Sequence, residues 1–215
     1  MNTRSEHLTA ALTATYQTRL KVSSDADAVL SAVAERMSQV ERCLYKEIRK
    51  GRSSGSPKNE FLTRFGITAR YFNFTRMSLD GKIDSVLSNL KRVVGEYDDR
   101  IKGQQSRIAK LSKRLKTEKC PEKRKSILAQ MHQRKRRIAT LEARKARLQA
   151  RLDNKDPAIC FGSKRLFGAQ HRLTENGYSS HAEWREEWRR SRQAQFGAVG
   201  SKDETAGNQT CQLTL

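Results

Sequence analysis

The side chains that most often carry catalysis or hold metals are scattered along this sequence without a recognisable spacing. No two cysteines stand two to four residues apart, as a zinc site needs. No glycine-rich loop followed by a Lys-Ser/Thr pair is present to bind a nucleotide phosphate. Asp98 and Asp99 are adjacent and point to different sides of a helix, whereas a two-metal nuclease needs converging carboxylates. We therefore expect no catalytic centre and no cofactor in this chain, which is then not an enzyme on its own.

Basic side chains are the chemically distinctive feature of the sequence. The 215 residues include 44 Lys and Arg against 23 Asp and Glu, a formal net charge of +21. Of these, 20 basic residues and only four acidic ones lie in residues 100–155, where the run Arg134-Lys135-Arg136-Arg137 has almost no carboxylate to pair with. A charge so concentrated repels itself, and a polyanion relieves the repulsion. We predict contact with a nucleic-acid backbone; a solvated helix face is the alternative.

A membrane is not the expected partner of this charge. No stretch approaches the length of a spanning helix, and the N-terminus lacks the apolar core of a signal peptide. The basic helices are also poor in the aromatic residues that surface-seeking helices carry opposite their basic face. We therefore expect an intracellular protein, cytoplasmic and associated with the nucleoid, whose four cysteines are reduced.

Two long amphipathic helices must position the basic residues. Apolar residues recur at steps of mostly four and three over residues 79–118, the pattern of a coiled-coil seam. Pro121 suits the first turn of a new helix, whose own seam ends at Leu152. Two such helices joined by a tight turn predict an antiparallel hairpin over about residues 79–153, with arms of roughly 45–60 Å.

Shorter helices are expected before the hairpin. Ser24, with acids behind it, predicts a helix N-cap. The apolar stripe in residues 29–48 predicts a buried face. Residues 51–57 read as a flexible break. A second helical stretch over residues 59–76, bent or split near Gly66, interleaves aromatic residues with arginines.

Strands are expected toward both ends of the chain. Alternating apolar and polar residues predict strands at 13–22 and 209–215, and apolar runs predict strands at 158–162 and 195–200. These ends would meet in one small β domain into which the helical middle is inserted. The last expected strand has no partner after it, which suits a truncated product.

Two helices are expected between these last strands. Residues 163–173 predict a short basic helix with Leu166 and Phe167 facing inward. The next helix places Trp184 and Trp188 one turn apart. Packing of this pair against the sheet is the favoured interpretation, and a base-stacking platform is the alternative.

Several stretches of the sequence resemble the TnpB family. They are FLTRFGITARYFN at 61–73, SLDGK at 78–82, CFGSKRLF at 160–167, ENGYSSHAEW at 175–184 and GSKDETAGNQ at 200–209. The last two are the most specific, because an Asn-Gly-Tyr turn, a capped Trp helix and this polar loop rarely coincide. The resemblance covers about residues 13–215. TnpB proteins are encoded by insertion sequences, are often described as transposases, and are RNA-guided DNA endonucleases related to type V CRISPR effectors.

The resemblance implies a wedge-like β-barrel domain interrupted by a helical recognition domain, which together hold a guide RNA and its target DNA. The implied fold is mainly α with a small β portion and an incomplete barrel. Its parts are a leader at 1–12, the first wedge part at 13–23, the helical domain with its hairpin at 24–156, and a truncated second wedge part at 157–215.

The sequence departs from the family at its C-terminal end. Family members carry there a RuvC-like nuclease domain with three metal-binding acids and a Cys-x-x-Cys zinc element, and neither is present here. Magnesium and zinc are therefore expected only in that missing half. The implied function is binding of guide-like RNA and DNA without cleavage, with a separate nuclease-domain polypeptide as a further candidate partner.

The residues expected to contact nucleic acid come from the stretch at 59–76, the hairpin and the short helix behind it. Arg70, Tyr71 and Asn73 would read a DNA motif, with packing of Tyr71 as the alternative. The predicted set is Arg64, Arg70, Tyr71, Asn73, Arg76, Lys82, Arg107, Lys110, Arg114, Arg134, Lys135, Arg136, Arg137, Lys164 and Arg165.

Two other functions stay open at this point. The chain is alternatively a non-enzymatic coiled-coil protein whose seams bind another polypeptide. It is alternatively a degenerate insertion-sequence remnant, whose unclosed sheet would expose an edge that favours aggregation.

Overall fold

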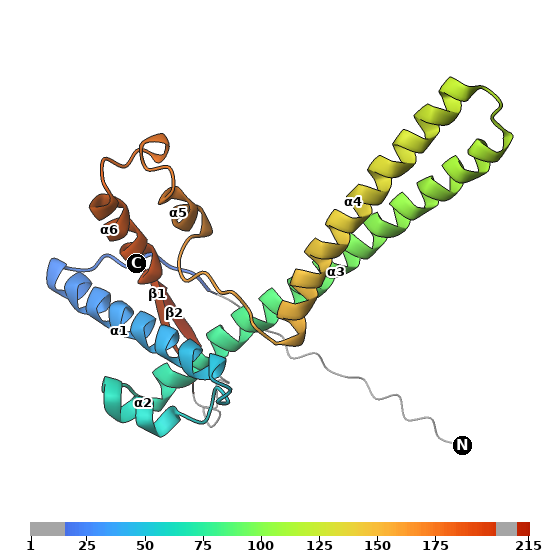
Figure 1. Ribbon diagram of the computed structural model, residues 1–215. Helices are drawn as coiled ribbons and strands as arrows, with labels where there is room; N and C mark the ends of the chain where they lie inside the picture. The colour runs from blue at the N-terminus through green and yellow to red at the C-terminus, as the bar shows by residue number, and fades with distance from the viewer. Residues whose placement is uncertain (1–15, 201–209) are drawn as a thin grey trace, which may run out of the picture.

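The computed structural model describes residues 16–200 and 210–215, and this part of the chain is mainly helical with one small sheet, as predicted. The elements are α1 (Ser24–Arg49), α2 (Lys58–Phe65), α3 (Ala69–Thr117), α4 (Pro121–Asp153), α5 (Lys164–Ala169), the 3-10 helix η1 (Thr174–Asn176), α6 (His181–Arg192), β1 (Gln195–Ala198) and β2 (Cys211–Thr214). Figure 1 shows α3 and α4 extending as a long hairpin away from a body that contains the other elements.

The predicted hairpin is confirmed, and its first helix is longer than expected. Helix α3 runs without a break for 49 residues, about 75 Å, beginning ten residues earlier than the apolar seam suggested. Pro121 opens α4, as predicted. The turn is fixed by Arg124, whose Nη1 donates hydrogen bonds to the carbonyls of Leu115 (2.9 Å) and Glu118 (3.0 Å). These bonds satisfy carbonyls that a helix end leaves without partners.

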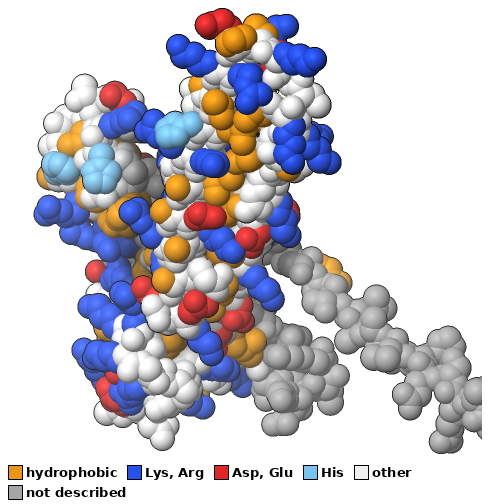
Figure 2. Space-filling view, turned by 45° about the vertical axis from the view of Figure 1, so that its right-hand side comes forward, with side chains coloured by type: hydrophobic (Ala, Val, Ile, Leu, Met, Phe, Trp, Pro, Cys, Tyr) orange, Lys and Arg blue, Asp and Glu red, His pale blue; other side chains and the backbone are white. Residues whose placement is uncertain are grey.

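The seam between α3 and α4 is only partly covered. Leu90, Val94, Ile101 and Ile127 are buried, while the other apolar seam residues are half-buried. Figure 2 shows hydrophobic side chains along the hairpin with basic side chains beside them. The seam of this hairpin is therefore partly open to solvent.

The core of the body lies where α1, α2 and α3 cross. Its buried members are Met37, Val40, Leu44, Phe61, Phe72 and Leu79. The rings of Phe61 and Phe72 meet edge to face, with centroids 5.9 Å apart. Gly66, in the left-handed conformation with φ 59°, ends α2 and allows the chain to turn into α3. The split predicted near this glycine is confirmed.

The start of α1 differs from the prediction in two ways. Its N-cap is Ser23 rather than Ser24, since the Ser23 hydroxyl accepts a hydrogen bond from the Ala26 amide at 3.3 Å. The buried stripe also begins later than expected, because Val29 is 64% exposed. The core formed by α2 and α3 lies along the second half of α1, so the first turns of the helix have no apolar neighbour to bury them.

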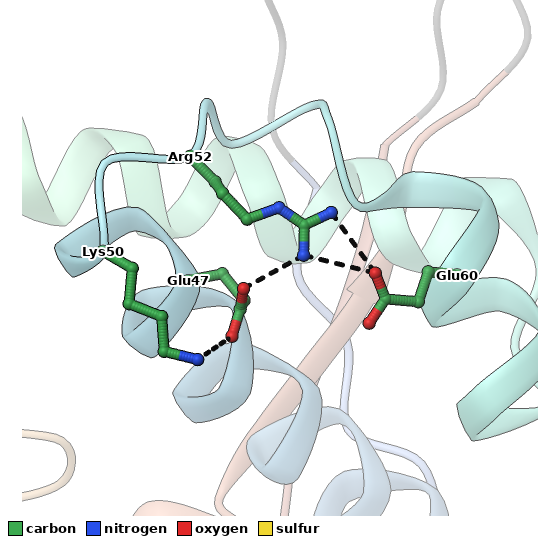
Figure 3. Close-up of polar contacts among 4 residues, drawn as sticks. All are labelled: Glu47, Lys50, Arg52 and Glu60. Atoms are coloured by element: carbon green, nitrogen blue, oxygen red, sulfur yellow. Dashed lines mark hydrogen bonds and ion pairs between the residues drawn. The ribbon is translucent and has the colours of Figure 1, made fainter.

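A network of ion pairs joins the end of α1 to α2 across residues 51–57. Arg52 donates to Glu47 at 3.0 Å and to Glu60 at 3.2 Å, and Lys50 donates to Glu47 at 2.7 Å (Figure 3). The hydrogen bonds from Lys50 and from Arg52 lower the pKa of Glu47 below its ordinary value. The connection that was predicted as a flexible break is therefore held in place through Arg52.

The prediction of a β domain formed by both ends of the chain is not confirmed, and two of the strands predicted for it do not form in the described residues. β1 and β2 form an antiparallel pair, with Gln195 opposite Thr214, but residues 16–23 and 158–162 form no strand. Tyr16 is 93% exposed, so the alternating pattern has no partner sheet to cover it. A strand needs a neighbouring strand, which sequence alternation does not supply. The described sheet has two strands and closes no barrel; residues 1–15 and 201–209 lie outside the described part.

The two C-terminal helices pack against each other. The indole of Trp184 donates from Nε1 to the carbonyl of Leu166 at 2.7 Å, and its ring stacks on that of Trp188 at 6.0 Å. We had expected the pair to pack against the sheet, but it packs against α5 instead. Phe167 is 50% exposed, so the prediction that it faces inward is wrong; its ring lies 5.6 Å from that of Trp188.

Candidate nucleic-acid interface

The hairpin has the residue spacing of an antiparallel coiled coil. Its seam recurs at alternating steps of three and four. On α3 it comprises Val94, Tyr97, Ile101, Gln104, Ile108, Leu111 and Leu115; on α4 it comprises Ile127, Met131, Arg134, Ile138, Leu141, Lys145, Leu148 and Leu152. All of these side chains are buried or half-buried. Each helix therefore has two flanks beside the seam, and in an antiparallel pair equivalent flanks face each other.

One flank is made of arginines at intervals of seven residues. Helix α3 carries Arg100, Arg107 and Arg114, and α4 carries Arg137, Arg144 and Arg151. Seven residues are two helical turns, so each set of three lies in one row along its helix. The two rows lie on the same side of the hairpin.

Four of these residues, Arg100, Arg107, Arg137 and Arg144, line one groove of about 650 Å³ between the helices, which we call the arginine groove. All four are exposed. Asp99 is the single carboxylate in its lining, and within the described residues it forms no ion pair with any of the four. Like charges so arranged repel each other, and none of the four arginines takes part in an ion pair within the described hairpin.

The opposite flank is different. It carries Asp98, Gln105 and Ser112 on α3 and Lys135, Glu142 and Gln149 on α4, a mixture of acidic, basic and neutral residues. Beside it, Lys145 in the seam pairs with Asp98 at 2.6 Å. An ordinary coiled coil has such mixed charges on both flanks. The positive charge of this hairpin is therefore biased toward the arginine groove.

A polar layer interrupts the seam beneath the groove. Arg134 donates from Nη1 to the side-chain oxygen of Gln104 at 3.0 Å, and Gln104 is only 8% exposed. The Nε of Arg134 is buried without a hydrogen-bond partner among the described residues. A polar pair inside an apolar seam specifies the register of two helices at a cost in stability. This pair sets which arginines face each other across the groove.

The predicted run at 134–137 does not act as one patch. Successive helical residues are about 100° apart, so Arg134 lies in the seam, Lys135 on the mixed flank, Arg136 on the outer face and Arg137 in the groove. Of the other predicted hairpin residues, Arg107 lines the groove, and Lys110 and Arg114 are exposed on α3 nearer the tip.

The predicted residues of α2 and early α3 lie elsewhere. Along α3, those between Arg70 and Lys82 lie about 27–45 Å from Arg100, the nearest arginine of the groove. Tyr71 packs against the core, which favours the packing alternative. Arg64 lies over the Phe65 ring at 5.1 Å. Arg76 pairs with Asp80 at 3.1 Å. The remaining members are Arg70, exposed in the first turn of α3, Asn73, half-buried there, and Lys82, ion-paired to Glu41.

The last two predicted residues, Lys164 and Arg165, are both exposed on α5, and Lys164 lines a second, larger pocket. The residues that the sequence prediction missed are Arg100 and Arg144. Their signal was present, because both stand seven residues from an arginine of the predicted set. Counting adjacent basic residues conceals this spacing.

Comparisons with protein-family models, curated proteins and solved structures found no match to this chain. Across residues 16–200 and 210–215, no three His, Cys, Asp or Glu side chains are grouped so as to hold a metal ion. In the same part of the chain, every helix is too short or too polar to cross a membrane.

Proposed function

We propose that this chain binds nucleic acid, with backbone phosphates held along the arginine groove. The observation that carries the proposal is the apposition of Arg100 and Arg107 on one helix with Arg137 and Arg144 on the other, with Asp99 as the single carboxylate in the lining. Such a flank opposes folding of the hairpin on its own. A polyanion in the groove turns this repulsion into binding energy.

The spacing of the rows suits a phosphate backbone. Arginines seven residues apart are separated by about 10.5 Å along a helix. A nucleic-acid strand rises about 10 Å over three nucleotides, at roughly 3.4 Å each. The arginines of one row are therefore spaced far enough apart to contact separate phosphates of a strand that crosses the groove. Guanidinium groups suit this contact because their planar fork donates two parallel hydrogen bonds to phosphate oxygens.

The resemblance to TnpB proteins suggests which nucleic acids the chain binds. We propose that the chain corresponds to the wedge and recognition part of such a protein, holds a guide-like RNA and its DNA target, and acts without a nuclease centre of its own. Phosphate contacts fix position and register but carry little sequence information. Sequence selection then comes from base pairing with the RNA rather than from the hairpin.

The test is the salt dependence of binding by the purified chain. Fluorescence anisotropy with a labelled RNA–DNA duplex, an RNA hairpin and a DNA duplex should give affinities that fall steeply with salt. For about 6–10 phosphate contacts, the expected loss is about 10³- to 10⁵-fold between about 50 and 200 mM salt. An affinity that is flat over this range would refute the proposal.

A second function is favoured by a separate observation, the partly open seam. Leu128 of α4 is exposed and most apolar seam residues are only half-buried. A helix from another polypeptide could cover that seam as the third member of a coiled coil. Sedimentation of the chain without nucleic acid tests this: a concentration-dependent oligomer supports it, and a monomer at all concentrations excludes self-association through the seam.

A further inference from the structure

The foot of the hairpin holds a second pocket whose chemistry differs from that of the groove. The pocket measures about 1180 Å³ and lies between α1, α3, α6 and the connection from α4 to α5, which returns from the hairpin to the body (Figure 1). Ligand pockets commonly span about 300–1,000 Å³, so one nucleotide fits readily. Arg151, the last member of the α4 arginine row, lines it. The row of the arginine groove therefore leads into this pocket.

One wall of the pocket is aromatic. Phe161, Phe167 and Trp188 line it together with Ile159. Trp188 is held from behind by the buried ring of Trp184, which is itself anchored on α5. Phe167 presents a half-exposed ring to the pocket side of this stack. A rigidly supported aromatic surface with one exposed ring, that of Phe167, resembles the platforms on which single-stranded bases stack.

Of the five cations that line the pocket, Lys82 pairs with Glu41 and the other four have no acidic partner among the described residues. These four are Arg42, Arg151, Lys164 and Arg192, and the lining contains no carboxylate. The guanidinium of Arg192 lies over the Trp188 ring at 5.6 Å, and its Nε is buried without a hydrogen-bond partner among the described residues. Burial, and then the charges of Arg42 and Arg189, lower the pKa of Arg192. A bound anion would offset both the burial of this charge and its repulsion by Arg42 and Arg189.

We infer that this pocket binds one unpaired nucleotide of a single strand, with its base against Phe167 and Trp188 and its phosphate between Arg42 and Arg192. A nucleotide can contact both the aromatic wall and the unpaired cations at once, so it should bind more tightly than a phosphate or an apolar ligand alone. Free phosphate uses only the cations, and an apolar ligand uses only the wall. The inference deepens the proposed function, because a strand leaving the arginine groove at its foot would reach this pocket.

The test uses the intrinsic fluorescence of the full chain, whose two tryptophans, Trp184 and Trp188, stack on each other at the pocket. Titration with the 5′-phosphorylated trinucleotide pU3 should quench this fluorescence, UMP should bind more weakly, and inorganic phosphate should compete poorly. Phe167→Leu keeps an apolar side chain but removes the ring, and should weaken pU3 binding by about 5- to 150-fold. Arg192→Gln should weaken it by about tenfold or more.

The matched control is Arg190→Gln, which removes the same charge from an exposed position of α6 outside the pocket and should leave the affinity unchanged. Equal competition by phosphate and by pU3 would reduce the pocket to a plain anion site and overturn the inference. Wild-type affinity in both Phe167→Leu and Arg192→Gln would overturn it as well. Arg192→Gln serves if Phe167→Leu does not fold, because the buried Nε makes no hydrogen bond that the variant loses.

Duplex binding measured in parallel separates this inference from the proposed function. If pU3 binds but duplexes do not, the pocket stands and the arginine groove fails. If duplexes bind with the expected salt dependence but pU3 does not, the pocket fails alone.

Discussion

Removing the charge of the arginine groove tests the central assignment. The perturbation is the fourfold variant Arg100→Gln/Arg107→Gln/Arg137→Gln/Arg144→Gln. Glutamine has nearly the helix propensity of arginine, so both helices should form as before. The variant also removes a repulsion between facing rows, so the hairpin should melt at the wild-type temperature or higher. A loss of binding in this variant therefore cannot be explained by unfolding.

The expected magnitude follows from the number of contacts removed. Each phosphate contact on a duplex contributes about 0.9 to the slope of log K against log salt. Loss of four contacts should reduce the slope by about 3 to 4. The assay is anisotropy of a labelled duplex at several salt concentrations. The slope is more informative than one affinity, because it counts the phosphates that the protein neutralises.

A matched control separates position from net charge. Lys102, Lys113, Lys116 and Lys125 are exposed residues on the outer faces of the same two helices. Their fourfold replacement by glutamine removes the same charge but leaves the groove intact, so the slope should change by less than about one. Equal slopes for the two variants would refute the assignment of binding to the groove and leave only a diffuse basic surface.

Three further predictions concern the fold. Gly197→Ala should destabilise the body by about 1–3 kcal/mol in thermal unfolding, because a Cβ there would lie 2.5 Å from an aromatic ring of α3 and 2.6 Å from a backbone carbonyl. As a control, Gly95→Ala should stabilise α3 by about 1 kcal/mol, because a Cβ there has no atom within 4 Å. Gln104→Leu alone should lower the stability of the hairpin by about 1–3 kcal/mol, because it leaves the Arg134 guanidinium without an acceptor. If the polar layer serves register, the double variant Gln104→Leu/Arg134→Leu should recover this stability and melt at a higher temperature than the wild type. Because its pKa is lowered on folding, Glu47 contributes stability above its unfolded pKa of about 4.3. The free energy of unfolding of the wild type, measured by chemical denaturation, should therefore exceed that of Glu47→Gln at neutral pH, and this difference should vanish as the pH falls through the folded pKa. A difference that is unchanged at low pH would contradict the ion-pair network.

The parts of the fold that local physics determines could be predicted from the sequence. The hairpin follows from three-and-four spacing and from Pro121, and the break before α3 follows from Gly66, which adopts a positive φ. The strands at 13–22 and 158–162 could not be judged in the same way. Alternation indicates that a segment could be a strand, but formation depends on a distant partner, and residues 16–22 and 158–162 have none in the described structure.

The sequence predicted that the candidate site would be basic and would lie on the hairpin, but not which face of each helix would carry it. A count of basic residues located it on the hairpin, and the run at 134–137 was chosen because its charges are adjacent. Adjacency is the wrong measure on a helix, because neighbours diverge by about 100° while residues seven apart align. The row from Arg137 through Arg144 to Arg151 required knowledge of the seam, and the pocket at its foot required the packing of α6, which no local pattern supplies.

The asymmetry between the two flanks is the feature that a purely structural hairpin does not need. Seam packing, the turn fixed by Arg124 and the pair of Lys145 with Asp98 already specify two antiparallel helices. Arginines facing each other on one flank add only repulsion to that structure, and glutamate on either helix would remove it. The arrangement becomes favourable when an anion lies between the rows, because the energy stored in the free hairpin is then released on binding. A ligand that binds only the folded state also stabilises it. The arginines that lower the stability of the free hairpin therefore raise its stability when an anion is bound.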